Sequence, residues 1–315
     1  MPGCGAFAPA PPPAGGFTPG IPVRWPDPGM IGIRTWPALL LFLLAGCATS
    51  FPSARPGQTF EDGLDARALF ARTLAAHGGD LAEAGGDFNL AMDGEWQSLI
   101  QRIQPVVTDA GFRITAEERF RPGDRLYAVR HRGPEGSKHV VRTPDSITVH
   151  YNGEPETDPA RLRATAMTTD AFQLFHFGPS LVKWRAHAMV RIADAREGGV
   201  RYRRLLATLR PGFGKSEEDQ VVLWIHPDTD LLFRVHLTLN GFETTQGAHV
   251  DTTFLAYDRV GPYVFPSRFD ERVRGPIRIG AHRWRITARD QDRGWTRAEV
   301  EGPDFSGNAA RPAGE

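Results

Sequence analysis

The sequence of 315 residues is short of cysteine, has no excess of either charge and contains no long apolar run. Its two cysteines, Cys4 and Cys47, cannot build a disulfide framework or a thiolate metal site, so an apolar core has to stabilise the fold. Basic and acidic residues number 37 each, and this balance leaves no overall basic field to attract nucleic acid. The apolar run from Trp36 to Leu44 is well short of the roughly 20 residues that a membrane-spanning helix needs.

That apolar run is part of an N-terminal pattern. Arg34 precedes it and Leu44-Ala45-Gly46-Cys47 ends it, in the order of a secretory signal peptide. These last four residues resemble the lipobox of bacterial lipoproteins. The resemblance implies cleavage between Gly46 and Cys47, a diacylglyceryl thioether on the Cys47 sulfur, and acylation of the new amino group, for example by palmitate. Such chains hold a soluble domain at a bilayer. An ordinary signal peptide, cleaved without lipidation, is the alternative.

Composition divides the chain into five segments. The first is rich in Pro and Gly and predicts a disordered leader, or a start annotated too early, with Met30 as the true first residue. A signal peptide, the lipidated cysteine with a polar flexible tether, a β-domain and a polar disordered tail are expected after it. The predicted boundaries are 1–29, 30–46, 47–63, 64–299 and 300–315.

The β-domain is predicted to be mainly β with two helices, an α+β arrangement. Residues 64–77 have helical spacing and end at two glycines, and residues 158–177 begin at a capping Asp158 followed by Pro159. Elsewhere apolar and polar residues alternate over short segments bounded by turn residues, which is typical of antiparallel hairpins. We expect roughly ten to twelve strands, and the thirteen candidate segments are 87–96, 103–108, 112–117, 126–131, 138–142, 147–151, 186–193, 200–209, 220–226, 231–239, 249–257, 263–273 and 282–288.

Two helices are too few to cover such a sheet. A helix about 10 Å across covers about two strands spaced about 4.8 Å apart. The remaining apolar face has to close on itself, pack on a second sheet or face a ligand. We therefore expect a curved antiparallel sheet, or incomplete β-barrel, lidded by helices and with an apolar interior.

Several segments of this meander resemble the LolA/LolB-like superfamily, the outer-membrane lipoprotein-sorting proteins and their relatives. The resemblance lies in residues 221–230, with the turn Asp228-Thr229-Asp230, and in residues 231–239, 252–254 and 261–266. It implies an incomplete β-barrel with a helical lid and an apolar cavity that takes acyl chains.

Strand parity gives candidate residues for such a cavity, although parity cannot separate a cavity from a filled core. Two phenylalanines of the predicted second helix are added to the strand residues. The candidates are Leu223, Ile225, Phe233, Val235, Leu237, Phe254, Phe172 and Phe175.

A second group could bind a metal ion. A symmetric hairpin places His236 opposite Asp251, with His249 on the same face, and two imidazoles with a carboxylate suit Zn²⁺ or Fe²⁺. The same parity puts His236 beside Arg234 and Thr238 on the wetter face, which favours a solvated His/Asp pair. No metal or other cofactor is therefore predicted.

The sequence contains no catalytic motif that we recognise, so no enzyme activity is predicted. It has no Gly-x-Ser-x-Gly elbow and no His-Glu-x-x-His, and residues 212–216 lack the spacing of a phosphate loop. The pattern predicts an envelope lipoprotein that binds a lipid or the acyl chain of a lipoprotein. Such binding suits a role in lipid or lipoprotein trafficking. Ala48 after the cysteine implies, by the same resemblance, the periplasmic face of an outer membrane. The alternatives are a structural lipoprotein with a packed core that binds a protein partner and, less favoured, a metal-dependent hydrolase.

Overall fold

The computed structural model describes residues 49–303. The predictions for residues 1–46, for Cys47 and for 304–315 lie outside this part of the chain. The strands are β1 Phe88–Trp96, β2 Thr115–Arg121, β3 Leu126–Gly133, β4 Gly136–Arg142, β5 Ile147–Tyr151, β6 Glu154–Pro155, β7 Ala186–Glu197, β8 Val200–Leu209, β9 Asp219–Ile225, β10 Leu232–Thr238, β11 His249–Val260, β12 Tyr263–Gly275 and β13 Ile279–Gln291. The helices are α2 Ala66–Ala76, α3 Leu81–Ala84, α4 Ser98–Ile103, α5 Pro105–Thr108, α6 Pro159–Phe177, α7 Pro179–Arg185 and α8 Arg297–Glu301, with 3₁₀ turns η1 Phe213–Lys215 and η2 Glu243–Thr245.

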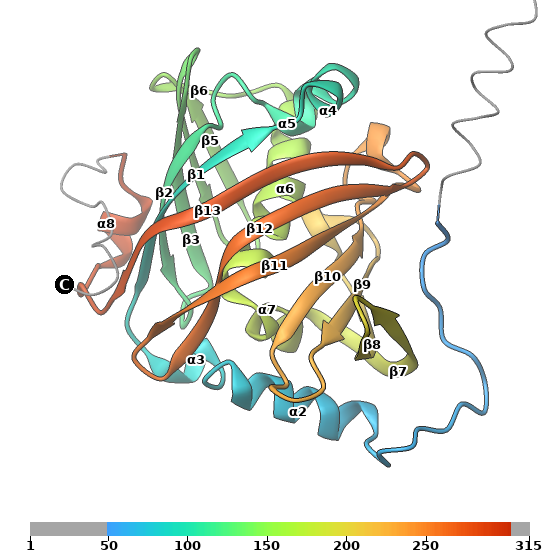
Figure 1. Ribbon diagram of the computed structural model, residues 1–315. Coiled ribbons are helices and arrows are strands. Elements are labelled where there is room, and N and C mark those ends of the chain that lie inside the picture. The colour runs from blue at the N-terminus through green and yellow to red at the C-terminus, as the bar shows by residue number, and fades with distance from the viewer. Residues whose placement is uncertain (1–48, 304–315) are drawn as a thin grey trace, which may run out of the picture. The chain divides into compact units, whose positions relative to one another are not determined.

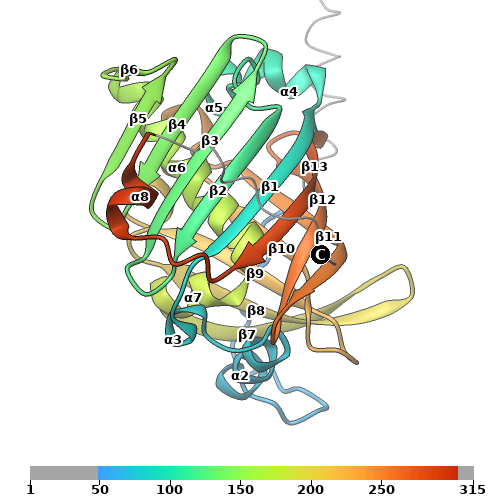
Figure 2. The same cartoon turned by 90° about the vertical axis from the view of Figure 1, so that its left-hand side faces the viewer.

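All these strands form one antiparallel sheet made of two meanders. Its order is β6-β5-β4-β3-β2-β1-β13-β12-β11-β10-β9-β8-β7. Strands β1 to β6 and β7 to β13 each follow chain order, and pairing of β1 with β13 joins the two halves. The sheet is open, because its edges are β6 and β7. Helices α6 and α7 connect these two edges, and the sheet curves around α6 (Figures 1 and 2).

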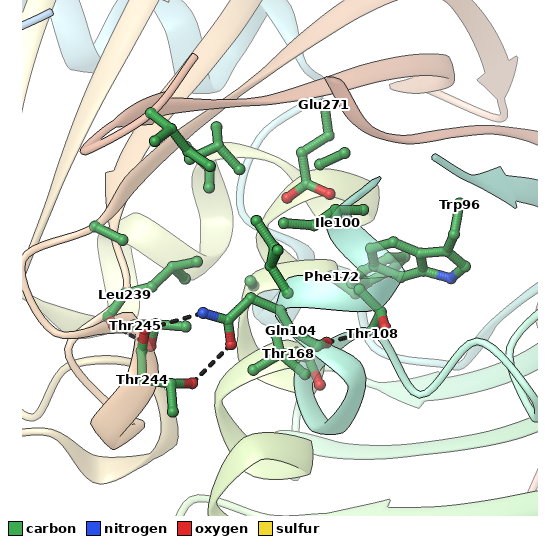
Figure 3. Close-up of a pocket in the computed structure, with 18 of the residues that line it drawn as sticks. Trp96, Ile100, Gln104, Thr108, Thr168, Phe172, Leu239, Thr244, Thr245 and Glu271 are labelled. Carbon is green, nitrogen blue, oxygen red and sulfur yellow. Dashed lines mark hydrogen bonds between the residues drawn. The ribbon is translucent and has the colours of Figure 1, made fainter. Parts of the chain in front are cut away.

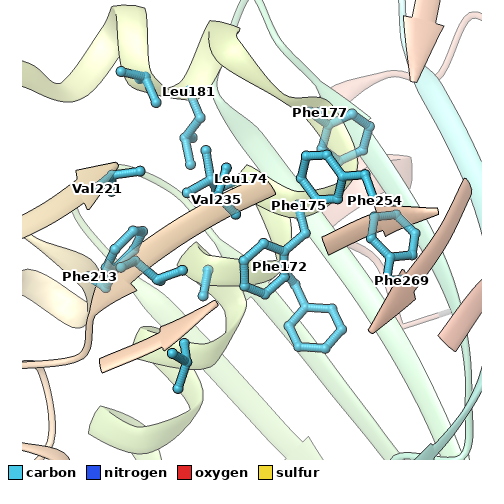
Figure 4. Close-up of a cluster of buried hydrophobic side chains, with 14 of the residues drawn as sticks. Phe172, Leu174, Phe175, Phe177, Leu181, Phe213, Val221, Val235, Phe254 and Phe269 are labelled. Carbon is cyan, nitrogen blue, oxygen red and sulfur yellow. The ribbon is translucent and has the colours of Figure 1, made fainter. Parts of the chain in front are cut away.

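Helix α6 fills most of the space that the sheet encloses. It begins where Asp158 accepts a hydrogen bond from the Ala160 amide (2.9 Å) and Pro159 occupies the first turn, and it ends at Gly178, whose φ of 65° suits glycine. Most of its residues from Ala164 to Phe177 are buried. The helix packs into one core cluster with side chains from both meanders. Figure 4 shows its phenylalanines beside Phe254 and Phe269 of the second meander.

The predicted fold class is confirmed: a curved antiparallel sheet with helices on its inner side. Both predicted helices are present, as α2 and α6. The prediction of two helices was too low, because α3, α4, α5, α7 and α8 are short and carry little periodic signal. Among the described residues, no helix is long and apolar enough to cross a membrane.

The strand predicted at residues 103–108 is wrong. This segment holds the end of α4 and all of α5. Pro105 has no amide hydrogen for a ladder and occupies the first turn of α5 instead. Ile100, Ile103 and Val107 recur at helical spacing, and all three face the same pocket.

The segment expected as a flexible tether is bonded to the outer face of the sheet over residues 49–63. The Thr49 amide donates to the Arg274 carbonyl (3.1 Å), and Phe51 packs edge-on against His236. Asp62 pairs with Arg191, and this ion pair lowers the pKa of Asp62 to about 2. These contacts cover a face that strand parity alone leaves open to water.

The predicted boundary at residue 299 falls inside α8. This helix has a capping box of Thr296 and Glu299, and Val300 is fully buried against Leu126 and Ala128. The folded part of the chain therefore continues past the predicted start of the tail.

Candidate ligand cavity

One end of the curved sheet holds a pocket of about 270 Å³ between α6, the α4–α5 segment, η2 and the ends of β11 to β13 (Figure 3). An engineered cavity of about 150 Å³ holds one benzene molecule, so this pocket has room for a single small apolar group or part of one chain. Its lining is mostly apolar. The apolar lining residues include Trp96, Ile100, Ile103, Val107, Ala171, Phe172, Phe175, Leu239, Val250, Val273, Ile277 and Ala281.

The wall formed by α4 and α5 is fixed from the inside by Arg113. Its guanidinium donates to the carbonyls of Val107 (3.2 Å) and Thr108 (3.3 Å), so it caps the end of α5. The same group lies 5.0 Å from the ring centre of Trp96 and 4.8 Å from that of Phe172. The two aromatic rings stabilise the buried Arg113 cation by cation–π contacts, so this cation is held in place by the protein itself.

The wall is joined to η2 by two exposed hydrogen bonds. The Gln104 side-chain amide donates to the Thr244 carbonyl (3.0 Å), and the Thr244 hydroxyl donates to Gln104 Oε1 (2.6 Å). Both residues line the pocket, and Figure 3 shows the bonds at its edge. Helices α4 and α5 also carry three exposed apolar side chains, namely Leu99, Ile103 and Val106.

Glu271 of β12 is the one ionisable side chain that lines this pocket in the described part of the chain. Its carboxyl group points into the pocket (Figure 3), and the residue is 8% exposed. Burial raises the pKa of Glu271 to about 7, and the nearby Arg113 cation opposes part of that rise. The pocket thus has a single ionisable group, in mostly apolar surroundings, besides uncharged polar side chains such as Gln104 and Thr168.

Only two of the eight predicted cavity residues line the pocket. These are Phe172 and Phe175 of α6. Leu223, Ile225, Val235, Leu237 and Phe254 have the predicted inward parity, but they lie in the filled core against α6, where each is at most 2% exposed. The expectation of a cavity at those five positions was wrong, because a single long helix fills the interior there.

Phe233 lies on the opposite face from the one predicted. The pairing of β10 with β9 shifts register between Leu232 and Arg234, so a bulge at Phe233 turns its ring outward. The ring stacks on Tyr202 with 4.2 Å between centres.

Glu271 is the lining residue that the sequence could have revealed. It alternates with Phe269 and Val273 on β12, and both of these belong to the apolar core. Acidic side chains are rarely buried, so a carboxylate at an inward position of a strand indicates a candidate site residue. Trp96 and Gln104 carry no comparable signal.

The predicted His236, His249 and Asp251 group lies on the outer face. His236 pairs with Asp251 across the β10–β11 hairpin, as the symmetric hairpin predicted. The two imidazoles contact each other through His236 Nε2 and His249 Nδ1 (2.7 Å), and Asp251 lies near Arg234 and Arg274. Among residues 49–303, no group of three or more His, Cys, Asp or Glu side chains is arranged to hold a metal ion.

The expectation that this pair is solvated was wrong. The three residues are 2–6% exposed, because the segment carrying Phe51 covers them. Burial lowers the pKa of His236 to about 3, with help from the neighbouring imidazole and arginines. The group is a buried polar cluster beneath the N-terminal segment.

Comparison with known proteins gives structural likenesses alone: no family model matches the chain, and no curated protein matches it. A DUF1329 family protein from Desulfovibrio piger is 11% identical, with 75% of this chain and 97% of that chain covered and a TM-score of 0.46. A LolA superfamily protein from Nitrosomonas europaea is 7% identical, with coverages of 72% and 93% and a TM-score of 0.43. For a putative outer membrane lipoprotein-sorting protein domain from Vibrio parahaemolyticus, the identity is 9%, the coverages 75% and 96% and the TM-score 0.38. The superfamily that the sequence resembles is among these neighbours, but likenesses this distant carry no argument about function.

Proposed function

We propose that this protein binds one apolar chain, of a lipid or of an acylated protein, in the pocket beside α6. The observation that carries the proposal is an almost wholly apolar pocket at the end of a core that is otherwise filled. An apolar hollow with few polar groups is the usual form of a site for an apolar ligand. At about 0.8 kcal/mol for each buried methylene, eight carbons contribute roughly 6 kcal/mol before the costs of association.

The binding is non-covalent, and it takes place in the cell envelope. Supporting this location is the lipobox-like sequence ending at Cys47, which implies a lipid anchor. Cell fractionation tests the anchor: the wild-type protein is expected in the membrane fraction and Cys47→Ala in the soluble periplasmic fraction. A membrane-bound Cys47→Ala protein would contradict lipidation at that residue.

Native mass spectrometry of the purified protein tests the binding. We expect an adduct of lipid or fatty acid that organic solvent removes, or uptake of one molecule of an added medium-chain alkyl compound. An unliganded mass under both conditions would reject the proposal.

A second candidate function is a structural lipoprotein that binds a protein partner. The filling of most of the interior by α6 favours it. It predicts the unliganded mass, so the same measurement separates the two candidates.

A further inference from the structure

The Glu271 carboxyl group has no protein partner. It forms no hydrogen bond or ion pair with any residue in the described range 49–303, although the residue is more than nine-tenths buried. A ligand that fills the pocket displaces water from this carboxyl group, and a polar group left without a partner then weakens binding. The group is also directed into the pocket and not into the core (Figure 3). A ligand in this pocket therefore meets one unpaired carboxyl group in mostly apolar surroundings.

The elements around Glu271 leave that carboxyl free. On the neighbouring strand β13, His282 lies directly opposite, and burial keeps its pKa well below the ordinary value, so its ring is neutral. Helix α6 contributes the apolar rings of Phe172 and Phe175 to the pocket. The charged groups that act on the Glu271 carboxyl are Arg113, which precedes β2, Asp251 of β11 and Asp270 of β12. Their effects have opposite signs, and none of these groups forms an ion pair with it.

We propose that Glu271 selects the ligand: the pocket takes a single alkyl chain that carries a hydroxyl group, and the hydroxyl donates a hydrogen bond to the Glu271 carboxyl. This inference rests on the proposed function. A carboxyl group accepts such a bond whether it is protonated or ionised, so a hydroxyl is matched in both states. A chain without a donor leaves the ionised carboxylate unpaired, although the protonated acid can donate to an acceptor such as an ether oxygen. An anionic group is repelled once Glu271 is ionised. Sites built around a buried polar group reject analogues that lack the matching group.

Three ten-carbon probes test the proposal in displacement of Nile red from the full-length protein. Decan-1-ol and methyl nonyl ether are isomers that differ in the donor, and decanoate adds a negative charge. At pH 8, where Glu271 is mostly ionised, we expect decan-1-ol to bind about tenfold more tightly than the ether, a ratio that equals about 1.4 kcal/mol. Decanoate is expected to weaken by a similar factor between pH 6 and pH 8. The ether should also weaken, because ionised Glu271 has no proton to donate to it, while decan-1-ol stays constant.

Two variants assign the selectivity to Glu271. Glu271→Gln offers both an acceptor and a donor, so it should bind the two isomers about equally and lose the pH dependence of decanoate binding. Glu271→Leu should bind the ether at least as tightly as the alcohol, and circular dichroism should show that it is folded. Equal affinities of the wild type for the two isomers at pH 8, or an unchanged preference in Glu271→Leu, would overturn the inference and leave the proposed function intact. If no probe displaces Nile red from the wild type, both fail.

Discussion

Gln104 and Thr244 are separated by 140 positions in the sequence and exchange two hydrogen bonds across the edge of the pocket. They join the α4–α5 segment to η2, and these two walls belong to different halves of the meandering sheet. Both bonds are exposed to water, and such bonds contribute at most about 1 kcal/mol each. The pair therefore holds the walls together weakly enough for thermal opening.

Gln104→Ala removes both side-chain bonds at this edge. We expect ligand association and dissociation to become roughly fivefold faster, since opening costs about 1 kcal/mol less, while the dissociation constant changes little. Stopped-flow mixing with Nile red measures both rates. Thr244→Ser keeps the hydroxyl and the carbonyl, so it is the matched control and should behave as the wild type. Unchanged rates in Gln104→Ala would show that ligands enter elsewhere.

The two meanders were predictable because their residues alternate with little interruption. Twelve of the thirteen strand candidates correspond to strands of the sheet, and the remaining segment, residues 103–108, is helical. The extent of the cavity was not predictable, because α6 is buried on all sides and no strand pattern encodes how much space such a helix occupies. Sequence parity correctly placed Leu237 and Val235 inward, yet packing decides that they touch α6 and not a ligand.

Filling the pocket with a large side chain should abolish binding without unfolding the protein. Ala248 lines the pocket between η2 and β11, and Ala248→Trp places an indole in the space that the ligand needs. We expect at least a tenfold loss of decan-1-ol affinity by Nile red displacement, with the thermal midpoint nearly unchanged. Ala188→Trp adds the same ring to an exposed position of β7 and is the control. Wild-type affinity in Ala248→Trp would place the ligand site outside this pocket.

A buried ion pair fixes α6 to the first meander. Arg142 of β4 makes two hydrogen bonds to Asp170 of α6 (2.9 and 3.0 Å), and Asp170 also accepts from the Gly214 amide. Both side chains are at most 6% exposed. Asp170→Ala leaves the Arg142 guanidinium buried without a counter-charge, with only the Thr143 and Ser146 carbonyls as partners. We therefore expect a loss of about 3–5 kcal/mol in the free energy of unfolding.

Urea denaturation measures this loss. The control is Asp93→Ala, which removes the partner of Arg285 in an exposed ion pair and should change stability little. A small effect of Asp170→Ala would mean that packing of the phenylalanines, and not the ion pair, fixes the helix.

The outer face shows a second limit of prediction from sequence. The positions of His236 and Asp251 across the hairpin followed from its symmetry, and the register confirms them. Their burial did not follow, because Phe51 comes from a segment about two hundred positions away that has neither strand nor helix periodicity. The bulge at Phe233 was not predictable either. One extra residue in a strand turns the side chain to the other face of the sheet, and no glycine marks the bulge in the sequence here.

His77 at the end of α2 is buried in its neutral form. The Leu232 amide donates to its Nε2 (3.0 Å), so the proton must be on Nδ1, which contacts the Val264 carbonyl (2.7 Å). The ring thus ties α2 to β10 and to β12. Burial lowers the pKa of His77 from 6.5 to about 4, because a charged ring would lose the Leu232 bond and its hydration.

This neutral ring makes stability depend on pH. Above pH 6.5 the stabilisation is complete; as pH falls from 6.5 towards 4 the unfolded chain binds the proton and the folded protein does not, so His77 alone should cost about 2 kcal/mol at pH 5. Other buried histidines, among them His236, act in the same direction.

His77→Gln isolates the contribution of His77 to this pH dependence. In urea denaturation the wild type should exceed this variant in stability at pH 7.5, and the difference should shrink by about 2 kcal/mol at pH 5. His187→Gln, on the exposed part of β7, should show no such convergence. A difference between wild type and His77→Gln that stays constant from pH 7.5 to pH 5 would mean that the folded protein accepts a proton at His77, which the amide of Leu232 should prevent.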